Sequence, residues 1–262
     1  MKSFLAYMGG KSLLTGKIIS KIPDHNCYVE VFAGAAWLLF KKEECSSHVE
    51  IINDINLDLV TLYRVIKHHL EEFIRYFKWE LISRDEFYRF RAENPETLTD
   101  IQKAARFYYL LKLGYAARVK DPAFSVATTS KPRLNLLRIE EELSAVHLRL
   151  ARVYIENRDY AEIFSRFDKP DTFFYVDPPY YGCEDYYGKG IFSREDFAKL
   201  RDILAGIAGK FILSINDVEH IRKLFKGFHI ESVKTTYSAA GANKKKRVSE
   251  LLIMNYKPKN TG

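Results

Sequence analysis

The sequence is poor in cysteine, with three among its 262 residues. Cys27, Cys45 and Cys183 are odd in number and widely spaced, so they supply neither a disulfide framework nor paired zinc ligands. A reducing, cytoplasmic setting is therefore expected. No metal site is predicted, because no other cluster of metal-binding side chains stands out in the sequence.

Long apolar runs are also lacking. The most apolar stretch, residues 28–40, is interrupted by Glu30, and no run approaches the roughly 18 residues that a membrane span needs. The first residues do not show the charged, apolar and small-residue order of a signal peptide. No internal repeat or low-complexity tract is present. These absences predict a globular protein without a membrane partner.

Negative charge is the scarcer sign, with 34 Asp and Glu against 41 Lys and Arg and a formal net charge of +7. Hydrophobic residues make up 47% and charged residues 29%, which is typical of a folded domain and excludes wholesale disorder. The positive excess favours an acidic partner, and nucleic acid is the first candidate. The aromatic content of 14% suits base stacking and an ordinary core equally well.

Strand-like and helix-like segments alternate in the first and last parts of the chain. This alternation is typical of an α/β fold with a mostly parallel sheet covered on both faces. The final two strands are joined by a loop without a helix, which predicts that the last strand is antiparallel. A helix is expected at 35–42, another from Ser193, and a third capped by Asp217. The expected strands are 28–32, 49–52, 153–155, 172–176, 210–214, 229–236 and 248–256.

The middle of the chain, residues 59–150, has a different texture and is predicted to be mainly helical. Ser83 with Glu86, and Thr99 with Gln102, have the spacing of capping boxes. Residues 114–132 contain two prolines and many small polar residues, which indicates a loop. Basic residues cluster in this region: Arg84, Arg89, Arg91, Arg106, Lys112, Arg118, Lys120, Lys131, Arg133 and Arg138.

Polar clusters follow four of the predicted strands, after Phe32 and at Asp54, Asp159 and Asp177. Ligands of open α/β sheets bind beyond the carboxyl ends of the strands, so these clusters predict one shared site. The Gly34 turn would let a ligand approach backbone N–H groups. Asp54 lies 20 residues further on, where a Rossmann-like site places its ribose acceptor. Taken singly, these features equally fit a tight turn and a surface acid.

Two common nucleotide-binding patterns are absent. The G-x-G-x-x-G pattern is missing, which argues against a nicotinamide cofactor. Residues 9–12 (Gly-Gly-Lys-Ser) superficially resemble a phosphate-binding loop, but Leu5 stands where that loop needs its first glycine. An ATPase is therefore not predicted.

The most specific motif is Asp177-Pro178-Pro179-Tyr180, directly after the apolar residues 173–176. The prolines end the strand and fix the backbone. The Asp177 carboxylate and the Pro178 carbonyl are two acceptors, which suits an NH₂ group with its two hydrogens. Tyr180 offers a flat ring on which a base can stack. The alternative is a proline turn that carries an acid and a ring by chance.

Taken together, these motifs resemble the Dam-type DNA adenine-N6 methyltransferases of the DPPY, class alpha, arrangement, which use S-adenosylmethionine. The resemblance spans nearly the whole chain. This sequence departs from the family pattern at Ala36, where a second glycine is usual, and at Val31, where proline is common. The motifs that carry the resemblance are residues 7–11 (YMGGK), 28–35 (YVEVFAGA), 53–56 (NDIN), 157–160 (NRDY), 177–180 (DPPY) and 247–256 (RVSELLIMNY).

The resemblance implies a Rossmann-like methyltransferase fold and two domains. Residues 1–58 and 151–262 would form the catalytic, S-adenosylmethionine-binding domain. Residues 59–150 would be an inserted, mainly helical target-recognition domain. In the cofactor site, Tyr7 and Lys11 would line the pocket, and Phe32 and Gly34 would surround the methionine part. The remaining roles fall to acids: Asp54 would accept from the ribose hydroxyls, Asp159 would meet the adenine amino group, and Asp177 would lie beside the cofactor.

The same resemblance implies a DNA adenine as substrate, held by Asp177, Pro178 and Tyr180. The amino group is hidden in a duplex, so the base must be flipped out of double-stranded DNA before direct, in-line methyl transfer. A monomer is expected. Lys244, Lys245 and Arg247 lie in a basic loop that would hold phosphates or would simply be a solvated hairpin tip. The candidate DNA contacts of the insert are Arg118, Lys120 and Arg133.

Other functions stay open at this point. DPPY-like motifs also suit cytosine-N4 and RNA adenine-N6 methyltransferases. A relative that binds DNA without turnover is a third alternative, suggested by Ala36. A GATC recognition sequence is an expectation from the family alone. The sequence does not distinguish a role in restriction-modification from one in repair, phage defence or regulation.

Overall fold

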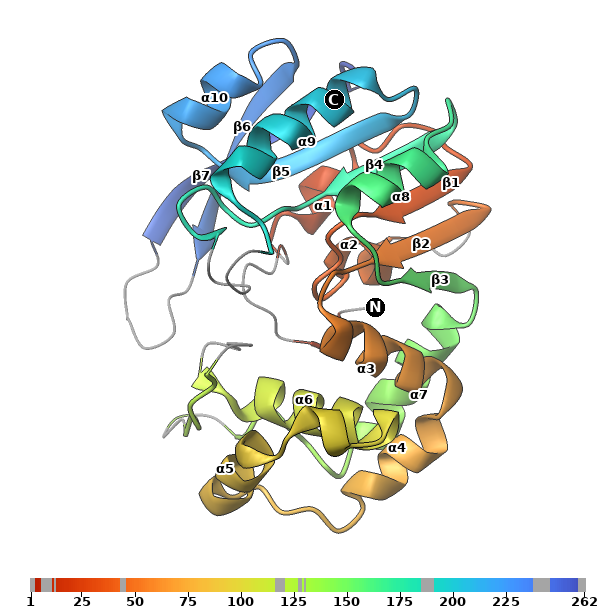
Figure 1. Ribbon diagram of the computed structural model, residues 1–262, viewed down its shortest axis with the longest axis vertical. Coiled ribbons are helices and arrows are strands. Elements are labelled where there is room, and N and C mark those ends of the chain that lie inside the picture. The colour runs from red at the N-terminus through yellow and green to blue at the C-terminus, as the bar shows by residue number, and fades with distance from the viewer. Residues whose placement is uncertain are drawn as a thin grey trace.

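The computed structural model describes residues 3–5, 11, 13–42, 46–115, 121–126, 129, 131–184, 191–237 and 246–258. At its centre is a seven-stranded sheet with the strand order β3-β2-β1-β4-β5-β7-β6 (Figure 1). The strands are β1 (Cys27–Glu30), β2 (Val49–Asn53), β3 (Val153–Glu156), β4 (Thr172–Val176), β5 (Lys210–Asn216), β6 (His229–Tyr237) and β7 (Lys246–Met254).

Strands β1 to β5 are joined by parallel pairings, and β7 is antiparallel to both β5 and β6. The predicted α/β class with a mostly parallel sheet and an antiparallel last strand is confirmed. In the register, Ser214 on β5 lies opposite Leu252, and Asn216 lies opposite Glu250. The last strand thus inserts between β5 and β6 and brings Glu250 to the end of β5.

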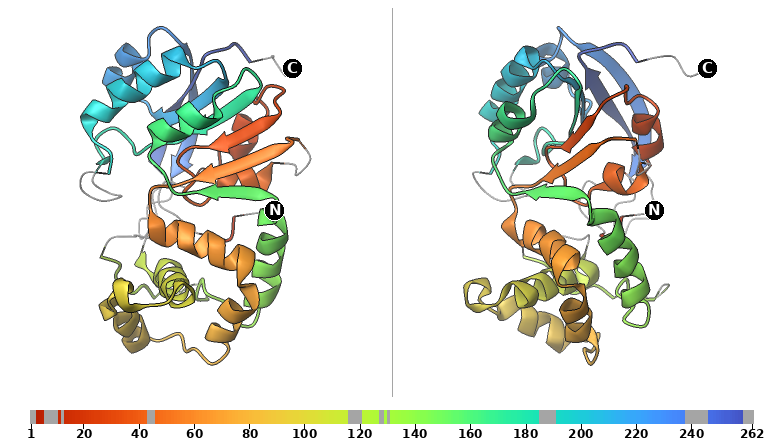
Figure 2. Two further views of the ribbon diagram at one scale, coloured as in Figure 1. Left: turned by 45° about the vertical axis from the view of Figure 1, so that its right-hand side comes forward. Right: turned by 90° about the vertical axis from the view of Figure 1, so that its right-hand side faces the viewer.

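Alternate residues of each buried strand face opposite sides of the sheet, as the twofold period of a strand requires. On one face, Tyr28, Phe173 and Tyr175 belong to a core shared with α1 (Thr15–Ile19) and α2 (Trp37–Lys41). On the other face, Val29 and Phe174 belong to a second core. Figure 2 shows the helices that cover this second face, namely α8 (Tyr160–Phe167), α9 (Arg194–Gly206) and α10 (Glu219–Leu224).

The region between β2 and β3 is helical, as predicted, and lies below the sheet in Figure 1. Ser83 and Thr99 are the N-caps of α5 and α6, and Thr99 forms the expected capping box with Gln102. The core of this region is continuous with the core under the sheet, through ring contacts such as Phe4 with Tyr63. Its elements are α3 (Leu57–His68), α4 (Leu70–Phe77), α5 (Arg84–Ala92), the 3₁₀ turn Pro95–Thr97, α6 (Asp100–Leu113) and α7 (Ile139–Leu150).

A buried ion-pair cluster joins the helical region to the sheet. Arg149 on α7 donates two hydrogen bonds to Glu50 on β2, at 2.5 and 2.9 Å, and a third to the Leu39 carbonyl at 3.0 Å. Lys42 Nζ lies 2.8 Å from the same Glu50 carboxylate. Because buried charges cost free energy unless they are paired, this cluster ties α2, β2 and α7 to one another in a fixed arrangement.

Two local predictions need correction. The N-cap of α10 is Val218, not Asp217, because the Asp217 carboxylate pairs with Arg222 at 2.6 and 2.7 Å instead of with the helix N-terminus. Part of the predicted loop 114–132 is paired, with an antiparallel bridge between Gly114 and Phe124. Within the described ranges, no helix has the length and apolar character needed to cross a membrane.

Candidate active site

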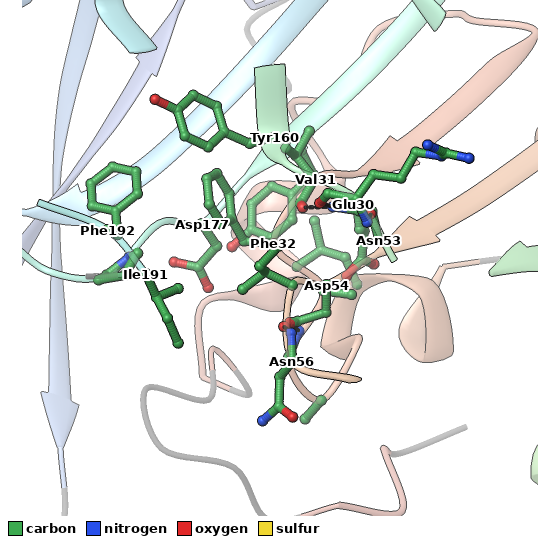
Figure 3. A pocket seen from close by; sticks show the side chains of 18 of the residues that line it. Glu30, Val31, Phe32, Asn53, Asp54, Asn56, Tyr160, Asp177, Ile191 and Phe192 are labelled. Atoms are coloured by element: carbon green, nitrogen blue, oxygen red, sulfur yellow. Dashed lines mark hydrogen bonds between the residues drawn. The ribbon is translucent and has the colours of Figure 1, made fainter. Parts of the chain in front are cut away.

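A pocket opens at the carboxyl ends of β1, β2, β3 and β4, where the sequence predicted a shared site. Figure 3 shows Asp177 and Asp54 beside Phe32, with Ile191 and Phe192 on the other side of Asp177. The polar side chains that line the pocket are Lys11, Glu30, Asn53, Asp54, Asn56, Arg158, Asp159, Tyr160, Tyr175 and Asp177.

The turn after β1 is held by Asp54. Its carboxylate accepts the Gly34 N–H at 2.9 Å and, through the other oxygen, the Asn56 N–H at 2.9 Å. Gly34 has φ of 49°, which favours glycine. Ala36 has φ of 48° as well, at a cost of about 1 kcal/mol for a residue with a side chain. The backbone therefore keeps the shape that a second glycine would favour, and the buried Ala36 methyl offsets part of the strain.

Side-chain amides tie the strand ends together around this pocket. Asn53 Nδ2 donates to the carbonyls of Val31 and Arg158, each at 3.0 Å, and its Oδ1 accepts the Arg158 N–H at 2.9 Å. Asn157 Nδ2 donates to the Asp54 carbonyl at 2.8 Å. These bonds fix the loops after β1, β2 and β3 to one another, so that their acids share one pocket.

Asp177 lies at the edge of a buried charged cluster. Its Oδ1 is 3.1 Å from Lys11 Nζ, which is also 2.9 Å from Glu250 Oε2 and 2.6 Å from the Tyr180 hydroxyl. The side chains of Lys11 and Glu250 are 2% and 1% exposed, whereas that of Asp177 is 19% exposed. Asp177 is thus the member of the cluster that remains accessible from the pocket.

Burial has the largest effect on the pKa of two acids at this end of the sheet, Asp177 and Glu30. It raises the pKa of Asp177 to about 7, with Lys11 acting to lower it and Glu250 to raise it. Burial likewise raises the pKa of Glu30 to about 7, against the hydrogen bonds from the Tyr28 hydroxyl and the Leu39 N–H. Asp177 therefore changes its protonation state near neutral pH.

The opposite wall is aromatic. Phe32 contacts Tyr160 and Phe192, with ring centroids 5.7 and 5.8 Å apart. Asp159 is exposed at the start of α8, where one carboxylate oxygen caps the helix by accepting the Ala161 N–H at 2.9 Å. The pocket thus combines an apolar surface for a flat group with acids on either side.

The structure brings together six of the seven residues predicted for the cofactor site. The seventh, Tyr7, lies outside the described residues. Pro178 and Tyr180 lie in the loop beside the pocket, but neither lines it, and Pro179 does. The six that line the pocket are Lys11, Phe32, Gly34, Asp54, Asp159 and Asp177.

Most of the predicted DNA contacts lie outside the described residues. These are Arg118, Lys120, Lys244 and Lys245, and for Arg247 only the backbone, in β7, is described. Arg133 is exposed, between α6 and α7. Other basic residues of the helical region between β2 and β3 serve the fold: for example, Arg106 donates to the Phe90 and Arg91 carbonyls.

Several residues of the site were not assigned a role from the sequence. Glu30, Asn53 and Glu250 lie inside quoted motifs, but their roles depend on partners far along the chain. Tyr175 is 3% exposed and lines the pocket, and among the described residues its hydroxyl has no hydrogen-bond partner at good geometry. A polar group in an otherwise apolar strand was the available signal for Glu30 and Tyr175, whereas the strand that carries Glu250 has other polar residues beside it.

The residues of the pocket suit an adenosine-type cofactor with a positively charged centre. Asp54 and Asp159 are carboxylate acceptors at the ends of neighbouring strands, and the Phe32 ring lines the same pocket. Acids outnumber Lys and Arg among the lining side chains, which favours a cationic ligand. In the part of the chain that is described, no group of three or more His, Cys, Asp or Glu side chains is arranged to hold a metal ion.

Comparison with known proteins agrees with this geometry. The chain is 28% identical to the type II methyltransferase M.CviBI of Paramecium bursaria Chlorella virus NC1A over 240 residues, which cover 89% of this chain and 90% of the relative. It is also 28% identical to the DNA adenine methylase of Escherichia coli K12 over 286 aligned positions, covering 98% and 96% of the two chains. The type II methyltransferase M.MjaIII of Methanocaldococcus jannaschii is equally similar, with 98% and 99% covered.

The family model for D12 class N6 adenine-specific DNA methyltransferases matches residues 7–239, which is most of the chain. This match selects DNA adenine-N6 methylation over the cytosine-N4 and RNA alternatives. It also selects an enzyme over a DNA-binding relative without turnover. With the DPPY acid, the Gly34 turn and the acids of two further strand ends in one pocket, the chain belongs to the D12 class of N6 adenine-specific DNA methyltransferases.

Proposed function

We propose that the pocket binds S-adenosylmethionine and an adenine flipped out of double-stranded DNA, and that a methyl group passes directly to the adenine N6. The observation that carries this proposal is the convergence of Asp54, Asp159 and Asp177 on one pocket from three separate strand ends. When bound, S-adenosylmethionine supplies a methyl group already activated by the positive sulfonium.

The chain's own residues would divide the work along the pocket. Asp54 would accept from the ribose hydroxyls and Asp159 from the adenine amino group of the cofactor. Phe32 and the Gly34 turn would surround the methionine part, with Lys11 and Tyr7 in the wall. The carboxylates of Asp54 and Asp159 already accept hydrogen bonds from backbone N–H groups. Because these bonds hold the two side chains in place, less entropy is lost when the cofactor binds.

Asp177 would hold the target amine. The N6 lone pair is delocalised into the purine ring, and hydrogen bonds from its NH₂ to Asp177 and the Pro178 carbonyl would increase its electron density. As the new N–C bond forms, the amine must lose one proton. Asp177, with a pKa raised to about 7, is basic enough to take it. Tyr180 would lie beside the flipped base and offset part of the cost of unstacking.

The helical region between β2 and β3 would recognise the DNA. In this proposal residues 59–150 form the target-recognition domain on a catalytic domain of residues 1–58 and 151–262, and the protein acts as a monomer. Arg133, together with Arg118 and Lys120, would contact the duplex, as would the basic loop with Lys244, Lys245 and Arg247. The net charge of +7 supports a phosphate-rich partner.

The test is methyl transfer from radiolabelled S-adenosylmethionine to mixed-sequence duplex DNA, followed by nucleoside analysis. We expect N6-methyladenine with the unaltered protein and a loss of more than about 1,000-fold in rate for Asp177→Ala, because that change removes both acceptor and base. Calorimetry should show that the variant still binds the cofactor. The exposed Asp171, just before β4, offers a matched control: Asp171→Ala should keep full activity.

A folded, cofactor-saturated protein that labels no DNA of any sequence would defeat the proposal. Activity retained by Asp177→Ala would instead remove only the role given to that carboxylate.

A further inference from the structure

Glu250 is a buried acid that lies behind the pocket without lining it. It is on β7, opposite Asn216 of β5, and its side chain is 1% exposed. Its Oε1 accepts a hydrogen bond from the Tyr180 hydroxyl at 2.5 Å, and its Oε2 accepts from Lys11 Nζ at 2.9 Å and from Ser214 Oγ at 3.1 Å. Both oxygens are therefore engaged by groups from other parts of the chain.

Lys11 is shared between two carboxylates. An ammonium has three donors, and those of Lys11 point to Glu250, Tyr180 and Asp177, at 2.9, 2.6 and 3.1 Å. The contact with Asp177 is the longest of the three. The electrostatic attraction of Glu250 for the Lys11 ammonium thus opposes a closer approach of that ammonium to Asp177.

We propose that Glu250 is a positioning residue for methyl transfer: it shares the Lys11 ammonium with Asp177 and thereby keeps that ammonium from occupying the carboxylate that receives the target amine. The inference rests on the role proposed above for Asp177. Without the second carboxylate, Lys11 would pair with Asp177 alone and would compete with the adenine NH₂ for the same oxygens. Glu250 also anchors the Tyr180 hydroxyl, which fixes the DPPY loop.

The electrostatics around Asp177 give this proposal a distinctive signature. The charged and titratable groups that face it are Lys11, Glu250 on β7, Tyr175 on β4, Tyr180 in the following loop and, at longer range, Glu30 on β1. Removing the charge of Glu250 lowers the pKa of Asp177 in two ways. A like charge disappears, and Lys11 moves fully onto Asp177. The two effects have the same sign.

The experiment compares the pH dependence of single-turnover DNA methylation in the unaltered protein, Glu250→Gln and Glu250→Asp, from about pH 5.5 to about pH 9. The unaltered rate should fall below neutral pH as Asp177 becomes protonated. The acid limb of the pH–rate profile is this fall in rate, and the plateau is the constant rate at higher pH. In Glu250→Gln, which keeps the size of the side chain, we expect the plateau rate to fall at least about tenfold and the acid limb to move about one pH unit lower.

Glu250→Asp separates charge from contact. It keeps the negative charge on a shorter side chain, so the plateau rate should fall while the acid limb stays where it is in the unaltered protein. Ser214→Ala, which removes one hydrogen bond to Glu250 and no charge, should likewise leave the limb in place. Glu250→Gln should still bind the cofactor in calorimetry, since Glu250 does not itself line the pocket.

The outcomes separate the two proposals. If Glu250→Gln loses rate but keeps the acid limb of the unaltered protein, Glu250 has only a structural role and this inference is wrong. If the unaltered protein methylates DNA at one rate across the whole pH range, the role of Asp177 itself fails. Thermal unfolding of each variant establishes that the compared proteins are folded.

Discussion

The sheet region and the helical region between β2 and β3 are both well packed, but they are built on different principles. In the sheet region, polar side chains gather at one edge, because parallel strands all end there. In the helical region, buried aromatic residues such as Phe73, Phe87 and Tyr108 fill the interior. Many of its described basic residues lie on the outside, and others, such as Arg106 and Arg149, bind acceptors within the fold.

In the function proposed above, the two regions have different tasks. A pocket for a small cofactor needs a few groups at fixed positions, and short loops at strand ends supply them. Contact with a long, uniformly charged duplex needs a broad basic surface, on which single residues contribute little. Changes in the sheet region should therefore affect chemistry and cofactor binding sharply, and changes on the helical surface should affect DNA affinity gradually.

The largest of these effects is expected on stability, at the buried ion-pair cluster that joins the two regions. Arg149→Ala leaves Glu50 buried with Lys42 as the remaining cation among its described contacts, and we expect the free energy of unfolding to fall by about 3 kcal/mol. Urea denaturation measures it. Arg152, three residues further on and exposed, is the control: Arg152→Ala should leave the urea midpoint almost unchanged. A small effect of Arg149→Ala would mean that apolar packing alone joins the regions.

A smaller effect is expected at the cofactor end of the pocket. Asp54→Ala removes the acceptor proposed for the ribose and the one that holds the Gly34 N–H, so cofactor affinity should fall about tenfold to a hundredfold. Calorimetry without DNA isolates this effect. Asp202→Ala alters an exposed acid on α9 and should bind the cofactor normally. Unchanged affinity in Asp54→Ala would place the ribose elsewhere.

The smallest expected effect is on the helical surface. Arg133→Ala should weaken DNA binding about fivefold and leave cofactor affinity unchanged. The slope of log affinity against log salt concentration should become shallower by about the amount that one phosphate contact contributes. DNA titrations at several salt concentrations measure both quantities. Arg138 is exposed as well but is paired with Glu141, so Arg138→Ala should change neither. A loss of cofactor binding in Arg133→Ala would contradict the division between the regions.

The sheet and its site were largely predictable, for a local reason. The strand at 172–176 and the capped helix after Ser193 follow from short patterns of apolar and capping residues. The Gly34 turn and the position of Asp54 at a strand end are each predicted by the neighbouring residues. By contrast, the Asp217 cap was wrong, because the Asp217 carboxylate pairs with the Arg222 guanidinium five residues further on.

Glu250 illustrates what local patterns omit. Its partners are Lys11, 239 positions earlier in the chain, and Tyr180, 70 positions earlier. Nothing near Glu250 in the sequence indicates them. The placement depends on β7 entering the sheet between β5 and β6, a choice set by packing of the whole sheet.

By itself, the sequence determined the α/β class, the strand ends that carry the acids, and the resemblance to adenine methyltransferases, because each depends on residues close together in the chain. Only the tertiary structure decided which groups surround Asp177 and how its charge is balanced. Burial and long-range pairing set the pKa of a carboxylate, and both arise when distant segments pack against one another.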